Sequence, residues 1–145
     1  MTIEILELTI QDYDDAITLW KGCSGVAIRD ADSSENIERY LNRNQGLSFK
    51  AVKDDELVGT ILCGHDGRRG YINHLVVSSN YRIQGIGRKL VETSLIGLRK
   101  QGIEKCHLFV FVENIEAKKF WERLGWKVRE EINMMSLSIS DSANP

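Results

Sequence analysis

The sequence is poor in proline and cysteine, and it lacks any long apolar run. It has one proline and three cysteines among 145 residues, so the cysteines cannot all pair with one another. Cys23, Cys63 and Cys106 are also too widely spaced for a zinc-binding motif. Because the sequence shows no signal peptide and no membrane-spanning stretch, we expect a cytoplasmic protein with reduced thiols, no metal and no membrane partner.

A surplus of positive charge is also missing. The chain has 19 Lys and Arg residues against 21 Asp and Glu residues, which gives a net charge of −2. Nonspecific binding to nucleic acid needs a basic surplus, so we expect no nucleic-acid partner. A hydrophobic content of 42% at this length is typical of one globular domain, here residues 1–139, followed by a polar tail at 140–145. Both a monomer and a homodimer are compatible with this composition.

Apolar periodicity divides the chain into strands and helices. Residues 86–101 repeat apolar side chains at helical spacing, whereas residues 105–112 form a nearly continuous apolar run of strand length. Ser33 or Ser34 can cap a second helix, and Asn114 a short fourth one. The whole pattern predicts four helices, which begin after residues 9, 33, 85 and 114, and strands at 3–8, 47–51, 57–63, 71–77, 105–112, 126–129 and 134–139.

The turn at residues 80–90 is basic and contains two glycines. It precedes a helix, yet no Ser, Thr, Asp or Asn stands at residues 83–85 to accept hydrogen bonds from the N–H groups of the first helical turn. Glycines let a ligand approach the backbone, and the helix dipole with Arg82, Arg88 and Lys89 favours an anion. We therefore expect a phosphorylated ligand here. The alternative is an ordinary loop with water on those N–H groups.

Two common phosphate-binding motifs do not fit this turn. A dinucleotide fingerprint would need a third glycine where the sequence has leucine, and a Walker loop would end in Gly-Lys-Ser/Thr. The pattern Arg82-x-x-Gly85-x-Gly87, preceded by Leu75-x-Val77, instead resembles the acetyl-CoA motif of the GNAT N-acetyltransferase superfamily.

A second segment resembles the same superfamily, in particular its small bacterial single-domain members. Residues 114–126 read Asn-x-x-Ala-x-x-x-Trp-Glu-x-Leu-Gly-Trp, where the family has Asn-x-x-Ala-x-x-x-Tyr-Glu-x-x-Gly-Phe. The resemblance extends over residues 2–139. It implies an α/β (α+β) fold with four helices and a twisted mixed sheet of six or seven strands, of which strands four and five splay apart to hold acetyl-CoA.

The resemblance also implies where acetyl-CoA, as the cosubstrate, would bind. The backbone at the end of the fourth strand would pair with the pantetheine arm, and the pyrophosphate would lie on the glycine turn. Asn114, besides capping its helix, would contact the arm from the other side. The implied cosubstrate-binding residues are Leu75, Val76, Val77, Arg82, Ile83, Gln84, Gly85, Ile86, Gly87, Arg88 and Asn114.

Acetyl transfer to an amine also needs a proton acceptor. The candidates near the expected donor are His74, Tyr71, Asn73 and Glu113, and histidine is the residue type that ordinarily titrates near neutral pH. We therefore predict His74 as the base. The alternatives are a water relay, Glu113, or a hydrogen-bonded His74 that only supports a half-buried strand. Residues 22–33 are a candidate lid on the acceptor side, or they simply connect two helices.

Trp121 stands where the family usually has a tyrosine that protonates or hydrogen-bonds the departing CoA sulfur. An indole N–H donates a hydrogen bond but does not give up its proton near neutral pH, so this catalytic position lacks the usual acid. The alternative is that Trp121 fills core volume with Ala117, Phe120 and Leu124.

The resemblance and the residues together predict an acetyl-CoA-dependent N-acetyltransferase, a kind of acyltransferase. Its acceptor would be a primary amine of a small molecule or of a protein. Two alternatives remain open at this point: a noncatalytic acyl-CoA-binding sensor, and a nucleotide-binding module that uses the same anion site.

Overall fold

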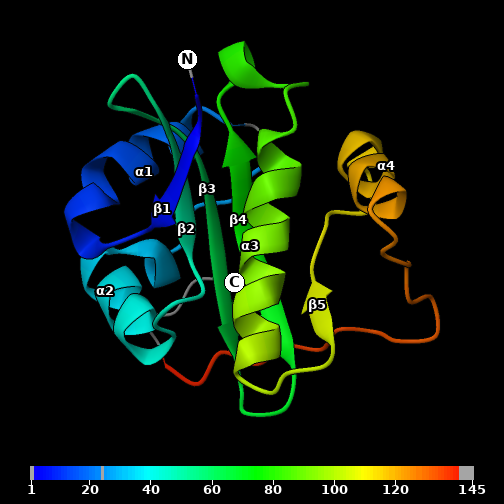
Figure 1. Cartoon of the computed structure of the whole chain (residues 1–145). Helices are drawn as coiled ribbons and strands as arrows, with labels where there is room; N and C mark the ends of the chain where they lie inside the picture. The colour runs from blue at the N-terminus through cyan, green and yellow to red at the C-terminus, as the bar shows by residue number, and fades with distance from the viewer. Residues whose placement is uncertain (1, 24, 141–145) are drawn as a thin grey trace. The chain divides into compact units, whose positions relative to one another are not determined.

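A computed structural model of the chain describes residues 2–23 and 25–140 (Figure 1). The chain divides into two compact units, residues 1–109 and 110–145. In their described residues, the first unit holds a sheet with three α-helices, and the second holds one α-helix. The single domain expected over residues 1–139 stays a prediction.

The described part of the first unit contains one sheet, with strands side by side in the order of the sequence. Neighbouring strands are antiparallel except for the last pair, which is parallel. A parallel pair requires a crossover connection, and a helix between the last two strands supplies it. The strands are β1 (Glu4–Glu7), β2 (Phe49–Lys53), β3 (Glu56–His65), β4 (Gly70–Val77) and β5 (Cys106–Leu108).

The helices of the first unit lie on both faces of the sheet (Figure 1). α1 (Tyr13–Lys21) and α2 (Ser34–Arg43) cover one face, and α3 (Ile86–Lys100) covers the other. α4 (Ile115–Arg123) belongs to the second unit. Three short 3-10 turns complete the helical elements of the described residues: η1 (Ile10–Asp12), η2 (Asp30–Asp32) and η3 (Ser79–Tyr81).

Each face of the sheet buries its own set of apolar side chains. On the α1 and α2 face, Trp20, Leu62 and Val76 are buried in one cluster. On the α3 face, a Cβ added at Gly59 would lie 3.3 Å from Leu90 Cδ1, so the missing side chain lets α3 approach β3 closely. These two layers hold β3 and β4 in the centre of the unit.

Two helix starts carry the capping residues that the sequence indicated, and a glycine follows the end of α3. Ser33 Oγ accepts a hydrogen bond from Asn36 N–H at 3.2 Å at the start of α2. Asn114 Oδ1 accepts one from Ala117 N–H at 3.1 Å at the start of α4. Gly102, with φ of 84°, follows the end of α3 in the left-handed conformation that glycine tolerates. The second and fourth helices therefore begin where the sequence predicted.

Three predicted strands were wrong: one is shorter than expected, and two are absent from the described residues. β5 ends at Leu108, although the apolar run continues to residue 112, and the described residues contain no strand at 126–129 or 134–139. A strand bonds its backbone groups to a neighbouring strand, and the described part of the second unit offers none. The predicted fold class, a mixed sheet with four α-helices, is confirmed with fewer strands than expected.

Candidate active site

A β-bulge interrupts β4. Between the paired residues Asn73 and Val76, β4 has two residues, His74 and Leu75, where β3 has only Ile61. His74 has a φ of 46°, a left-handed conformation that is uncommon for residues other than glycine. A bulge of this kind bends the strand and increases its local twist.

Beyond the bulge, one edge of β4 is open. β4 pairs with β5 only at residues 70–72, and no described strand lies beside that edge further along. Ser78 N–H donates to the carbonyl of Val58 in β3 at 2.8 Å. Because backbone groups alternate in direction along a strand, the N–H and carbonyl of Val77 point away from β3. The predicted separation of the fourth and fifth strands is confirmed, and the Val77 N–H faces the open edge.

α3 begins without a side-chain cap, as the sequence indicated. Its N-cap residue is Gly85, with φ of 78°, and no side chain accepts a hydrogen bond there. Within the helix, Lys89 N–H donates to the Gly85 carbonyl at 3.1 Å. In the described part of the chain, no acceptor meets the N–H groups of residues 84–88. The space beside Gly85 is open, because an added Cβ would meet no atom within 4 Å.

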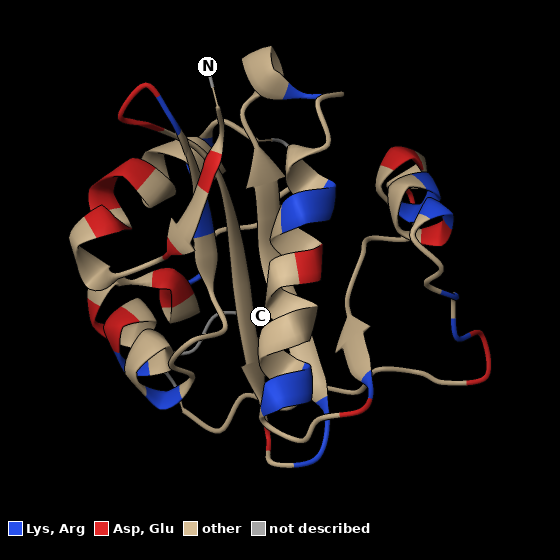
Figure 2. Cartoon of the chain, viewed as in Figure 1, with Lys and Arg blue, Asp and Glu red and all other residues tan. Residues whose placement is uncertain are grey.

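Basic side chains accompany this helix start. Arg82 Nε donates to the Val77 carbonyl at 3.2 Å, which connects the turn to the end of β4. Arg88 Nε donates to Glu92 Oε1 at 3.1 Å, an exposed pair that contributes little stability. Along α3, four Lys and Arg positions stand against one Glu, whereas residues 10–43, which include α1 and α2, have seven Asp and Glu against four Lys and Arg (Figure 2). Together with the helix dipole, these charges favour an anion at the start of α3.

Ile83 is the strained residue of this turn. It has a φ of 63°, and its side chain is fully exposed. A β-branched residue rarely adopts the left-handed conformation, and here no packing of the side chain offsets the cost. Strained backbone of this kind concentrates at ligand-binding sites.

The imidazole of His74 belongs to a buried network on the face that α1 and α2 cover. Its Nε2 lies 2.8 Å from Asp32 Oδ1, and its ring centroid lies 4.7 Å from that of Trp20. The hydroxyl of Thr60 donates to the His74 carbonyl at 3.1 Å and accepts from Trp20 Nε1 at 2.8 Å. Side chains from η2, α1 and β3 therefore fix both the ring and the backbone of His74.

Asp32 is a candidate site residue that the sequence did not indicate. Its Oδ2 accepts the backbone N–H of Arg29 at 3.0 Å, and its carbonyl accepts the Tyr13 hydroxyl at 2.6 Å. Burial acts to raise the pKa of Asp32, but the hydrogen bonds from His74 and Arg29 outweigh it and lower that pKa. The carboxylate is therefore ionised near neutral pH. The only sequence signal was its place within residues 22–33, the candidate acceptor-side segment.

The roles predicted for Trp121 and Asn114, which belong to the second unit, stay predictions. Trp121 is buried, and its ring packs edge-on against Phe120 and Trp126 with centroids 5.2 and 5.0 Å away. These contacts support the alternative in which Trp121 fills core volume within this unit. Asn114 caps α4, and Glu113, which precedes it, is exposed.

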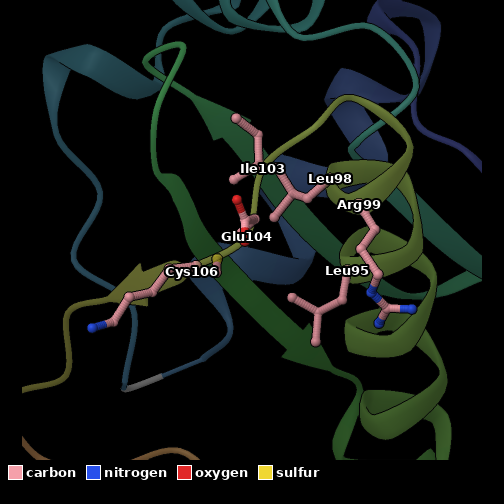
Figure 3. Close-up of a pocket in the computed structure, with 7 residues that line it drawn as sticks. Leu95, Leu98, Arg99, Ile103, Glu104 and Cys106 are labelled. Atoms are coloured by element: carbon pink, nitrogen blue, oxygen red, sulfur yellow. The ribbon is translucent and has the colours of Figure 1, made fainter.

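Two cysteine thiols and a pocket on α3 do not form a competing site. Burial raises the pKa of Cys63 to about 12 and that of Cys106 to about 11, so neither is a thiolate near neutral pH. A pocket of about 170 Å³ lies at the C-terminal half of α3, away from the glycine turn, with Leu98 and Ile103 in its lining (Figure 3).

No described cluster of His, Cys, Asp or Glu could hold a metal ion, and no described helix is long and apolar enough to cross a membrane.

Comparison with known proteins gives a match over most of the chain. The model of the acetyltransferase (GNAT) family matches residues 13–126. The acetyltransferase SG1711 of Sodalis glossinidius is 31% identical over 134 residues, which cover 92% of this chain and 93% of that protein.

Solved structures are similar over similar lengths. The PaiA N-acetyltransferase of Thermoplasma acidophilum, in complex with coenzyme A, is 26% identical with a TM-score of 0.77, covering 89% of this chain and 92% of that one. The aminoglycoside acetyltransferase meta-AAC0020 from an uncultured soil metagenomic sample, in complex with sisomicin, is 21% identical with a TM-score of 0.75. That alignment covers 95% of this chain and 97% of the other, and it shows a likeness of fold alone.

Proposed function

Because the chain belongs to the acetyltransferase (GNAT) family, we propose that it transfers the acetyl group of acetyl-CoA to a primary amine of a small molecule or of a protein. The observation that carries this proposal is the uncapped start of α3, which Arg82 connects to the open edge of β4. N–H groups of the turn would bind the pyrophosphate. The backbone of residues 75–77 would bind the pantetheine arm of the same molecule.

An anion on the turn would also account for the strain in it. The free N–H groups of residues 84–88 and the dipole of α3 would gain charge-assisted hydrogen bonds from a phosphate. Each such bond contributes about 1.5–3 kcal/mol, which is enough to offset the left-handed conformation of Ile83. The basic side chains of the turn would add to the attraction without having to contact the phosphate directly.

The proposed chemistry assigns one task to each part of the site. The neutral amine nitrogen attacks the thioester carbonyl carbon, so that a C–N bond forms and the C–S bond breaks. The Val77 N–H would stabilise the charge that develops on the carbonyl oxygen. The proton that the amine loses passes to His74 as the general base, and the CoA thiolate takes up a proton from water to become the free thiol.

The charge of the acceptor side supports an amine as the second substrate. The segment that carries α1, η2 and α2, residues 10–43, has seven Asp and Glu residues against four Lys and Arg residues, and its helices cover the face where His74 lies (Figure 2). A protonated amine would be attracted to this face and would lose its first proton to water, which leaves the neutral amine that attacks the thioester. A noncatalytic acyl-CoA sensor is the second candidate, because Trp121 replaces the tyrosine acid that the family usually carries.

A panel of amines distinguishes the enzyme from the sensor. We expect incubation with acetyl-CoA and a suitable primary amine to release free CoA thiol, measured with a thiol reagent, faster than amine or protein alone. The panel should include polyamines, aminoglycosides and peptides with a free N-terminus. Binding of acetyl-CoA without thiol release from any of these amines would favour the sensor.

Gly85→Val should weaken CoA binding by roughly 10²-fold or more, because a side chain would fill the space beside the turn and displace its N–H groups. Isothermal calorimetry measures the change. Gly102→Val is the matched control, since Gly102 has a φ of 84°, an equally open surrounding and a place at the other end of α3. Both variants should lose a similar amount of stability. Equal CoA affinity in the two variants would show that the turn does not hold the cosubstrate.

His74→Asn should lower kcat/KM by roughly 10²-fold or more and leave CoA affinity unchanged, because asparagine tolerates the left-handed backbone but cannot act as a base. The pH profile of kcat/KM should also lose the limb that the imidazole causes. His65→Asn, at the far end of β3, is the control. If His74→Asn loses stability but keeps its turnover per folded molecule, His74 has a structural role only.

Trp121→Tyr should raise kcat by roughly tenfold while CoA affinity stays the same, because a phenol can share its proton with the departing thiolate. The parent is expected to be slow but active, since a thiol with a pKa of about 8.5 leaves as a tolerable thiolate. Trp126→Tyr, which replaces the other indole of the same aromatic contact, controls for packing. An unchanged kcat in Trp121→Tyr would mean that no acid is needed at this position.

A further inference from the structure

Two short turns in the first unit are built in the same way. In η1, Asp12 Oδ2 accepts the N–H of Thr9 at 2.9 Å, and in η2, Asp32 Oδ2 accepts the N–H of Arg29 at 3.0 Å. The second oxygen of each carboxylate then holds a side chain from the sheet. Asp12 Oδ1 lies 2.6 Å from Lys50 Nζ, whereas Asp32 Oδ1 lies 2.8 Å from His74 Nε2. The two aspartates therefore differ mainly in the partner that they hold.

We infer that Asp32 is the positioning residue of the active site: its carboxylate fixes His74 as the tautomer with the proton on Nε2, so that Nδ1 is the nitrogen that takes the proton of the acceptor amine. This inference deepens the proposed function and rests on it. Asp32 does not touch the reacting atoms, and it acts only through His74.

The tautomer follows from the hydrogen-bonding capacity of the two groups. An ionised carboxylate can only accept, so at 2.8 Å the hydrogen between Asp32 and His74 must belong to Nε2. A neutral imidazole carries one N–H, which leaves a lone pair on Nδ1. In the described residues Nδ1 has no hydrogen-bond partner, and it is not fully buried, so part of its surface reaches solvent.

The surroundings hold this pair in one geometry. The side chains of His74 and Asp32 are only 16% and 10% exposed, so water competes little with their contact. Trp20 packs against the imidazole ring, and the Tyr13 hydroxyl bonds the Asp32 carbonyl. When the amine proton arrives on Nδ1, the imidazolium that forms already has a carboxylate beside it, as a base with an orienting partner requires. No further reactant is needed to balance this step.

The parallel turns supply a matched pair of variants. Asp32→Asn and Asp12→Asn each replace a carboxylate that caps a turn and holds one side chain. In Asp32→Asn, the amide can donate to Nε2, which favours the proton on Nδ1 and blocks the base. We expect a loss of kcat of roughly 10²-fold or more for Asp32→Asn, with an unchanged KM for acetyl-CoA. Asp12→Asn should lose similar stability and keep the parent kcat.

The tautomer can be measured directly by nuclear magnetic resonance of the 15N-labelled imidazole of His74. We expect Nε2–H in the parent protein and a shift toward Nδ1–H in Asp32→Asn but not in Asp12→Asn. The parent spectrum alone tests the inference if Asp32→Asn does not fold.

Two results would overturn this inference and leave the proposed function intact. One is a proton on Nδ1 of His74 in a parent protein that releases thiol, and the other is an equal kcat in Asp32→Asn and Asp12→Asn. A parent that binds acetyl-CoA but releases no thiol with any amine would overturn the proposed function, and this inference would fall with it.

Discussion

The bulge in β4 is the constraint on which both sides of the candidate site depend. It requires a φ of 46° at His74, a conformation that costs a residue with a Cβ about 1–2 kcal/mol. The buried hydroxyl of Thr60, which bonds the His74 carbonyl and Trp20 at once, holds the chain in that conformation. Along one edge, the bent strand leaves β5 paired at only three residues, and on one face it directs the imidazole to Asp32.

The charge distribution of the first unit differs between the two faces of the sheet. On one face of the sheet, α3 carries four Lys and Arg residues and one Glu, whereas residues 10–43, which include α1 and α2 on the other face, carry seven Asp and Glu residues and four Lys and Arg residues (Figure 2). In the proposed reaction the cosubstrate is an anion and the acceptor a cation, so the two would be steered to different faces that meet at β4. A chain with a net charge of only −2 can therefore offer local attraction to both substrates.

A contact between charged groups, such as that between His74 and Asp32, is a weak source of stability. Taking such groups out of water costs free energy that their mutual attraction repays only in part. What the pair provides is a fixed ring with one defined donor and one free lone pair. A site that must take a proton from an amine needs that geometry, whereas an ordinary core does not.

The sequence by itself determined the local features of this protein. The uncapped start of α3, the caps at Ser33 and Asn114, and the strands up to β4 follow from residue types and spacings that act over a few neighbouring residues. The family motif lies in the same local stretches, which is why the fold class could be predicted.

Only the tertiary structure decided which distant residues meet. The alternation at residues 134–139 suggested a strand, but a strand exists only beside another, and pairing is a property of the whole unit. Asp32 and His74 are 42 residues apart, and no spacing between them carries a signal. Their contact depends on where η2 lies against the bulge in β4. The residue type at position 74 does not prescribe the φ of 46° found there, because contacts with Trp20 and Thr60 impose it.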